Sequence, residues 1–253
     1  MTEKEILTRL SPGTPTGIRV FPSLPSTNTA LREWASEGAP HGAAVIAEGQ
    51  TAGRGRLGRA FSSPAGAGLY ISLLVRRDLP LEALPLLTPY AAVAAARAIE
   101  RVAKVEVGIK WVNDLRIGDL KIGGILTEGS LTPGGALDFA IVGIGINLLP
   151  GALPPELSGI AAAIGDYTTP PAPEDLAAAL LDGFYQGLAD FSTGGFMQEY
   201  RRRSVVLGRH LEAFDASRHY FGIATAIEDD GALRLSTPEG DLLLRAGEVS
   251  IRM

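Results

Sequence analysis

The sequence predicts an α+β fold, in which a mixed β-sheet with flanking helices is followed by a small all-β unit. Apolar runs of strand length and amphipathic segments of helix length follow one another without strict alternation, which argues against a doubly wound parallel fold. After about Arg203 only short strands remain, separated by the turn signals Asp229-Asp230-Gly231 and Pro238-Glu239-Gly240. We therefore expect a domain over residues 1–203 and a small β-barrel domain over residues 204–253.

The first part of the chain is expected to combine three strands with one helix. Residues 1–16 contain two prolines and a glycine and are predicted to form a weakly structured arm. The segment Ser26-Thr27-Asn28 offers three side chains that can cap a helix, and that helix should stop at Gly38. The strands expected here are Ile18–Phe21, Ala43–Ala47 and Leu69–Val75.

The middle of the chain is expected to be rich in strands between two long helices. An alanine-rich helix should span Leu84–Val102, and a second helix should begin at Pro173 and Glu174. The strands expected between them are Val105–Trp111, Leu120–Glu128 and Phe139–Leu148. The arginine run Arg201–Arg203 is predicted to be a solvated helix end, where positive charge suits the helix dipole.

Composition narrows the function classes. The net charge of −5 argues against a general nucleic-acid binder, so we expect no DNA partner. The absence of cysteine excludes disulfides and thiolate chemistry, and it fits a reducing compartment. The most apolar long stretch, Leu81–Ile99, is broken by two prolines and an arginine, so it reads as a buried helix rather than a membrane span. We expect a cytoplasmic protein with no membrane partner.

The loop Gly53–Arg59 holds three arginines and three glycines directly after a predicted strand. It could be a solvated surface turn, since charged loops are common. Its glycines also match the dinucleotide fingerprint GxGxxG, but that pattern needs a helix after the third glycine, and residues 59–64 predict none. The third interpretation fits best: glycines expose backbone N–H groups and arginines supply forked donors, which predicts a flexible clamp for a phosphate or acyl phosphate.

A second group of polar residues follows the strand that ends near Trp111. Asn113, Asp114 and Lys121 flank a turn at Gly118-Asp119, so a hairpin would bring them together. An amide, a carboxylate and a mobile ammonium suit a nucleotide, its Mg²⁺ and an anion, respectively. An edge hairpin with a surface ion pair is an equally open interpretation.

The segment Gly143–Asn147 carries glycines at alternate positions of a predicted strand. One face of that strand therefore lacks side chains, and either a ligand or another backbone can approach it closely. A tightly packed core strand explains the pattern equally well. The three histidines lie far apart in sequence and show no metal-ligand spacing, and the chain lacks both a P-loop and a serine-nucleophile elbow.

Taken together, these segments resemble the catalytic domain of biotin protein ligases. The order and spacing match from about Ile18 to about Leu148, and the small C-terminal β unit matches as well. The resemblance implies a fold similar to class II aminoacyl-tRNA synthetases with an SH3-like C-terminal barrel. The motifs that carry it are Ser26-Thr27-Asn28, Gln50 with Gly53–Arg59, Lys110–Asp114, Lys121 and Gly143–Asn147.

The resemblance also implies roles for individual residues. Lys121 looks like the lysine that contacts the biotin carboxylate and the α-phosphate, and Arg56 belongs to the loop that orders over them. Residues that would line the biotin site are Ser26, Thr27, Asn28, Gln50, Arg54, Gly55, Arg56, Lys121, Gly124 and Gly143. Residues that would contact ATP are Arg56, Arg59, Asn113, Asp114 and Asn147, with Asp114 near its Mg²⁺.

The implied activity is a ligase that makes biotinyl-5′-AMP from biotin and ATP and passes biotin to a lysine of a biotin carboxyl carrier protein. ATP, Mg²⁺ and biotin are then required, without a tightly bound metal, and a homodimer is compatible with the sequence. Two departures stand out: Phe61 replaces a common tryptophan, and Val112 replaces the common proline of the K-W-P-N-D motif. Only 25 residues precede Ser26, which is typical of the form without a DNA-binding domain.

Two rival hypotheses remain open. A lipoate ligase or octanoyltransferase shares the fold class but lacks the Gly-Arg-Gly-Arg loop and typically has a different lysine motif. A non-catalytic nucleotide sensor would bind ATP or biotin without forming a product, and it would have no need of Lys121.

Overall fold

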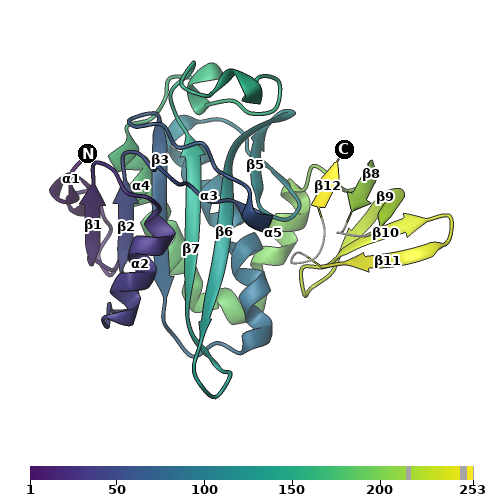
Figure 1. Ribbon diagram of the computed structural model, residues 1–253, viewed down its shortest axis with the longest axis horizontal. Coiled ribbons are helices and arrows are strands. Elements are labelled where there is room, and N and C mark those ends of the chain that lie inside the picture. Colours follow the sequence, from purple (N-terminus) through teal and green to yellow (C-terminus); the bar gives the residue numbers. More distant parts are fainter. Residues whose placement is uncertain (215–217, 246–249, 253) are drawn as a thin grey trace.

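The computed structural model describes residues 1–214, 218–245 and 250–252. Its main body is built on a seven-stranded sheet of order β1-β2-β3-β7-β6-β5-β4 (Figure 1). Only β1 and β2 pair in parallel and the other neighbours are antiparallel, so the expected mixed sheet is confirmed. The strands are β1 (Ile18–Phe21), β2 (Ala44–Ala47), β3 (Gly68–Val75), β4 (Gly108–Lys110), β5 (Asp114–Ile117), β6 (Leu120–Leu131) and β7 (Leu137–Asn147).

Helices cover both faces of this sheet, and for that reason every residue of β3 is buried. Successive side chains of a strand point to opposite faces. Leu73 accordingly packs in the core formed with α3 and α4, whereas Leu74 packs in the smaller core beneath α2. The helices are α1 (Glu3–Leu7), α2 (Thr27–Ser36), α3 (Leu87–Ala103), α4 (Pro173–Gly187) and α5 (Phe196–Arg203), and the 3₁₀ turns are η1 (Arg56–Gly58), η2 (Leu81–Leu86), η3 (Pro155–Leu157), η4 (Ile164–Asp166) and η5 (Leu188–Thr193).

Helix boundaries follow local chemistry. Pro173 begins α4, since its missing N–H is not needed in the first turn, and Glu174 and Asp175 place negative charge at the positive end of the helix. The chain leaves α3 through Lys104 in the left-handed conformation. No helix within the described residues combines the length and apolar character that a membrane crossing requires.

The prediction of a weakly structured N-terminal arm is wrong. Residues Glu3–Leu7 form α1, because Thr2 and Glu5 make a reciprocal capping box at its start. Ile6 is fully buried in the main core, and the loop after the helix is held by Asp182, which accepts hydrogen bonds from Ser11 and Thr14. The breaker residues Pro12, Gly13 and Pro15 follow this helix and do not prevent it.

Two further expectations need correction. The expected strand Val105–Trp111 is shortened to β4, and a separate strand, β5, forms the other side of the hairpin. The arginine run is only partly solvated. Arg202 is exposed, but the Arg203 side chain is buried and pairs with Glu100 and Glu199 at 2.6 and 2.7 Å.

The C-terminal unit is a five-stranded antiparallel sheet of order β11-β10-β9-β8-β12, which confirms the expected small β unit. Both predicted turns join strands as expected. The unit lies beside α5 (Figure 1), and Trp111 Nε1 donates to the carbonyl of Gly231 at 3.0 Å. The boundary at Arg203/Ser204 stays our prediction. The strands are β8 (His210–Phe214), β9 (His219–Ile227), β10 (Leu233–Thr237), β11 (Gly240–Leu244) and β12 (Ser250–Arg252).

Candidate active site

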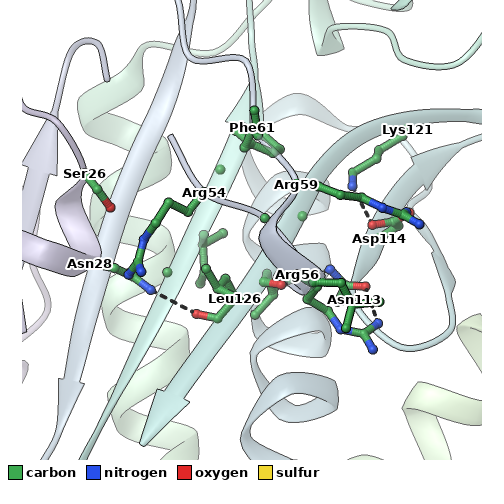
Figure 2. A pocket seen from close by; sticks show the side chains of 18 of the residues that line it. Ser26, Asn28, Arg54, Arg56, Arg59, Phe61, Asn113, Asp114, Lys121 and Leu126 are labelled. Carbon is green, nitrogen blue, oxygen red and sulfur yellow. Dashed lines mark hydrogen bonds and ion pairs between the residues drawn. The ribbon is translucent and has the colours of Figure 1, made fainter. Parts of the chain in front are cut away.

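A pocket of about 180 Å³ lies between the Gly/Arg loop and the ends of β6 and β7. Figure 2 shows Arg54 beside Asn28 at one end of it, and Arg56 and Arg59 near Asn113 and Asp114 at the other. Every predicted site residue except Asn147 lines this pocket. The lining residues are Ser26, Thr27, Asn28, Gln50, Arg54, Gly55, Arg56, Leu57, Arg59, Ala60, Phe61, Lys110, Trp111, Asn113, Asp114, Lys121, Gly124, Ile125, Leu126, Gly143, Ile144, Gly145 and Ile251.

The Gly/Arg loop folds back on itself as a narrow tongue. Hydrogen bonds from Phe61 N to Gly53 O at 2.9 Å and from Gly55 N to Arg59 O at 2.7 Å hold its two sides together. Gly53 is required because a Cβ there would lie 2.4 Å from the Phe61 carbonyl oxygen. The tip is a 3₁₀ turn with Leu57 in the left-handed region, and no α-helix follows it. The dinucleotide fingerprint therefore lacks its helix.

The first turn of α2 forms one end of the pocket, and a hydrogen-bond network holds it. Thr27 N donates to Gln50 Oε1 at 2.9 Å, and Gln50 Nε2 donates to Ser63 Oγ at 2.8 Å. Ser72 Oγ lies 2.6 Å from Asn28 Oδ1 and 2.8 Å from Thr27 Oγ1, beneath the helix. The polar groups at this end are therefore oriented before a ligand arrives, which is what recognition of a polar ring needs.

Two glycines make room for side chains in the pocket. A Cβ on Gly143 would lie 2.2 Å from Asn28 Oδ1, so only glycine at this position lets Asn28 reach across β7. Gly124 faces the Lys121 side chain, with Nζ 3.2 Å from the position of a Cβ. Glycine is used at both positions for close approach of side chains.

The other end of the pocket is the hairpin of β4, β5 and β6. Lys121 Nζ lies 2.6 Å from Asp114 Oδ1, and Arg56 donates to Asn113 Oδ1 at 3.3 Å (Figure 2). The predicted convergence of Asn113, Asp114 and Lys121 is thus observed. Lys121 Nζ also lies 5.9 Å from the centroid of the Phe61 ring, which packs on Gly145.

Asn147 stands apart from the other predicted residues. Its side chain is buried, and Nδ2 donates to the carbonyl of Ala162 at 3.0 Å. It therefore holds the segment after β7, whose Ala162 N in turn donates to Lys121 O at 2.9 Å. In this structure Asn147 supports the backbone of Lys121 rather than facing the pocket, and its contact with ATP stays a prediction.

Several residues of the site were not predicted. Glu128 contacts Asn28 and Arg54, and its place could have been found from period-2 alternation, since Gly124, Leu126 and Glu128 share one face of β6. Ser72 could have been flagged as a hydroxyl in an otherwise apolar strand. Ile251 has no sequence signal, because its approach to the pocket depends on how the C-terminal sheet docks.

The pocket is strongly cationic. Its lining includes five basic side chains, Arg54, Arg56, Arg59, Lys110 and Lys121, and one carboxylate, Asp114. Burial lowers the pKa of Arg56 and of Lys110, and in both cases nearby Asp114 partly offsets the effect. The Nη2 atom of Arg56 is buried and has no hydrogen-bond partner among the described residues. An anionic ligand would satisfy this donor and relieve the repulsion.

We expect Lys110→Met to stabilise the unliganded protein but to weaken the binding of an anionic ligand in the pocket. Burial lowers the pKa of the Lys110 ammonium, so below that pKa the folded state bears the cost of a buried charge. This cost fades as pH rises toward the ordinary lysine pKa of 10.5, and the gain in Tm on substitution should fade with it. Losing one charge-assisted hydrogen bond, worth about 1.5–3 kcal/mol, should raise KM for an anionic substrate by roughly tenfold or more. Thermal melts at several pH values and initial rates check both effects, and a destabilised variant at pH 7 would contradict the first.

Comparison with known proteins shows the family to which the chain belongs. The family model described as "Biotin/lipoate A/B protein ligase family" matches residues 20–147. The "Bifunctional ligase/repressor BirA" of Bacillus subtilis (strain 168) is 34% identical over 238 residues, covering 90% of this chain and 72% of that protein. The "Biotin--[acetyl-CoA-carboxylase] ligase" of Mycobacterium tuberculosis is 31% identical over 233 residues, covering 88% and 85%.

A solved structure agrees with the sequence matches. The biotin protein ligase from Aquifex aeolicus in complex with biotin and ATP superposes with a TM-score of 0.80 at 26% identity, covering 93% of this chain and 98% of that one. Fold, pocket and matches define an ATP-using acyl ligase. The chain belongs to the biotin/lipoate A/B protein ligase family. Within that family the similar proteins are biotin protein ligases, which confirms the resemblance seen in the sequence.

Proposed function

We infer that this chain is an ATP-dependent biotin ligase, which forms biotinyl-5′-AMP and then transfers biotin to a lysine of a biotin carboxyl carrier protein. One observation carries the inference: a preorganised polar slot at Ser26–Asn28 runs directly into a cluster of five basic side chains. The neutral ring system of biotin would fit the polar slot. Its carboxylate tail and the adjacent nucleoside triphosphate would then lie among the basic side chains. The similar proteins support the same reaction, since one is named as a biotin ligase and another binds biotin and ATP.

In the first step the carboxylate of biotin attacks the α-phosphorus of ATP, and the bond to pyrophosphate breaks. Two anions must approach each other, so their repulsion must be offset by cations. Lys121 lies at the junction of the slot and the hairpin, where its ammonium can contact both the carboxylate and the α-phosphate. Arg56 supplies its unpartnered buried Nη2 to the phosphate from the loop side.

In the second step the amine of the carrier lysine attacks the carbonyl carbon of the mixed anhydride, and AMP leaves. No side chain of the ligase has to form a covalent bond, which fits the absence of a nucleophile motif. The ligase must instead keep water away from the anhydride until the carrier arrives. The tongue of residues 53–59 has the position and the glycine content for that task.

Magnesium is a further part of the proposal, as the companion of ATP. Among the described residues no group of three acidic, histidine or cysteine side chains forms a cage for a metal ion. Mg²⁺ is commonly held by one or two carboxylates together with substrate phosphates, and Asp114 is the pocket carboxylate that would serve. When bound, the ion supplies charge neutralisation at the phosphates.

The decisive experiment mixes the protein with biotin, Mg-ATP and a biotin carboxyl carrier domain and measures the mass of the carrier. A gain of one biotinyl group is expected. Replacing biotin with lipoate or octanoate tests the lipoate-ligase hypothesis. A gain of carrier mass with those acids and none with biotin would establish it. Binding of ATP and biotin without any product would favour the sensor hypothesis instead.

We expect Arg56→Gly to release biotinyl-AMP early. The substitution removes the buried guanidinium that faces the phosphate, and one hydrogen bond to a charged group is worth about 1.5–3 kcal/mol. The dissociation rate of the adenylate should therefore rise by roughly 10- to 100-fold. Rapid filtration of a preformed complex measures it, with Arg202→Ala, an exposed arginine of α5, as the control. Retention equal to that of the unmodified protein would contradict the clamp.

A further inference from the structure

A single carboxylate oxygen of Glu128, in β6, accepts hydrogen bonds from side chains of two other segments. Asn28 Nδ2, from α2, donates to Glu128 Oε2 at 2.8 Å. Arg54 Nη2, from the Gly/Arg loop, donates to the same atom at 2.6 Å. Arg32, one turn further along α2, lies 3.8 Å from that atom. The Glu128 side chain is 22% exposed, so this junction lies partly out of solvent.

The junction fixes how the Asn28 carboxamide is turned. Its nitrogen faces Glu128 and, at 3.4 Å, the carbonyl of Leu126 (Figure 2). Its oxygen therefore faces Ser72, whose Oγ lies 2.6 Å away. Without the carboxylate at position 128, the carboxamide would lose the shorter of the two hydrogen bonds that its nitrogen donates, and with it the main contact that fixes this orientation. The polar face offered to a ring at this end of the slot thus depends on a residue that does not line the pocket.

The junction also holds the tongue over the slot. Arg54 is the first arginine of the tongue, and its ion pair with Glu128 spans from the loop to the sheet. A charge-assisted hydrogen bond of this length is among the stronger polar contacts in proteins. Because the same oxygen also accepts the hydrogen bond from Asn28, a substitution of Arg54 should alter the contact with Asn28 as well.

We propose that Glu128 is a positioning residue that couples closure of the Gly/Arg loop to the shape of the biotin slot, a proposal that rests on the proposed function. The Glu128 carboxylate faces Asn28, Arg54 and Arg32, so it acts through these neighbours and not on the reacting atoms. Loop closure and biotin binding then share one coupling free energy, and each favours the other to the same extent.

The test compares Glu128→Gln with the unmodified protein by biotin-dependent pyrophosphate exchange and by calorimetric titration with biotin. Glutamine keeps the size of the side chain but offers one neutral acceptor oxygen in place of a carboxylate, so the bonds from Asn28 and Arg54 should weaken while the fold is retained, which thermal melts can verify. We expect KM and Kd for biotin to rise about tenfold, while KM for ATP and kcat change less than about twofold. A purely structural role would lower kcat and both affinities together.

A double-mutant cycle with Arg54→Met checks the coupling itself. If Glu128 acts through Arg54, the two substitutions together should cost little more than the costlier one alone. Asp138→Asn is the matched control, because Asp138 of β7 pairs with Arg76, the residue after the end of β3, outside the pocket. We expect that variant to keep its biotin affinity.

Two results would overturn the role of Glu128: biotin affinity unchanged in Glu128→Gln, or effects of the two substitutions that simply add. A failure of the proposed function looks different, since the unmodified protein would then show no biotin-dependent exchange at all. Should Glu128→Gln not fold, Glu128→Asp still tests the junction, because the shorter side chain keeps the charge but withdraws the carboxylate from Asn28 and Arg54, and Kd for biotin must then rise.

Discussion

Replacing Lys121 with alanine is expected to slow formation of biotinyl-AMP by about 100-fold or more. The ammonium lies 2.6 Å from Asp114, at the point where carboxylate and α-phosphate would meet. Removing one preorganised donor of this kind typically costs about 2.7–4 kcal/mol of transition-state stabilisation.

Biotin-dependent pyrophosphate exchange measures this effect directly. Lys4→Ala, in the exposed part of α1, is the control for loss of a lysine. Lys121→Arg should recover little, because a planar guanidinium cannot take the place of a compact ammonium beside Gly124. Exchange at the unmodified rate in Lys121→Ala would remove Lys121 from the mechanism.

Substituting alanine for Gly143 is expected to abolish tight biotin binding while leaving the protein folded. The new Cβ would lie 2.2 Å from Asn28 Oδ1 and 2.9 Å from Cγ, so the whole carboxamide must move. Gly143 pairs with Ser72 across the sheet, so the hydrogen bond between Ser72 and Asn28 is lost as well. Overpacking of this sort costs about 1–3 kcal/mol in stability. We expect Kd for biotin to rise by about 100-fold.

Calorimetric titration with biotin and a thermal melt separate these two effects. Gly183→Ala is the matched control, because nothing lies within 4 Å of a Cβ at this position in α4. That control should gain roughly 0.5–1 kcal/mol of stability, since alanine favours the helix. Unchanged biotin affinity in Gly143→Ala would show that Asn28 does not contact the ligand.

Much of the site was predictable because its chemistry is local in sequence. The tongue, the Ser26–Asn28 turn and the hairpin of Asp114 and Lys121 each need particular residues within a few positions. The mixed sheet was predictable for the same reason, because strand and helix periods are local patterns. Glycine at 143 was ambiguous from the sequence, and the structure shows that its open face accommodates the Asn28 side chain.

What could not be predicted depends on contacts between distant segments. Arg203 looked solvated because its own neighbours are charged, but its side chain is buried against Glu100, a half-buried partner that α3 supplies. Glu128 resembles any charged residue on a strand until Arg54 and Asn28 are placed beside it. The first helix was missed because its stability comes from a capping box and from burial of Ile6, not from a long amphipathic pattern.

The pocket wall draws on residues as far apart in the chain as Ser26 and Ile251. A ribosome adds about 5–20 residues per second, so Ser26 and Ile251 are synthesised roughly 10–45 s apart. During that interval the tongue and Lys121 already exist, but the cavity has no closing side at Ile251. A nascent chain thus passes through a stage at which it holds the arginines and the lysine of the pocket without the side chain that completes its wall at Ile251. Ribosome-arrested chains of increasing length would reveal this order, as biotin-dependent exchange that begins only after residue 251 has cleared the exit tunnel.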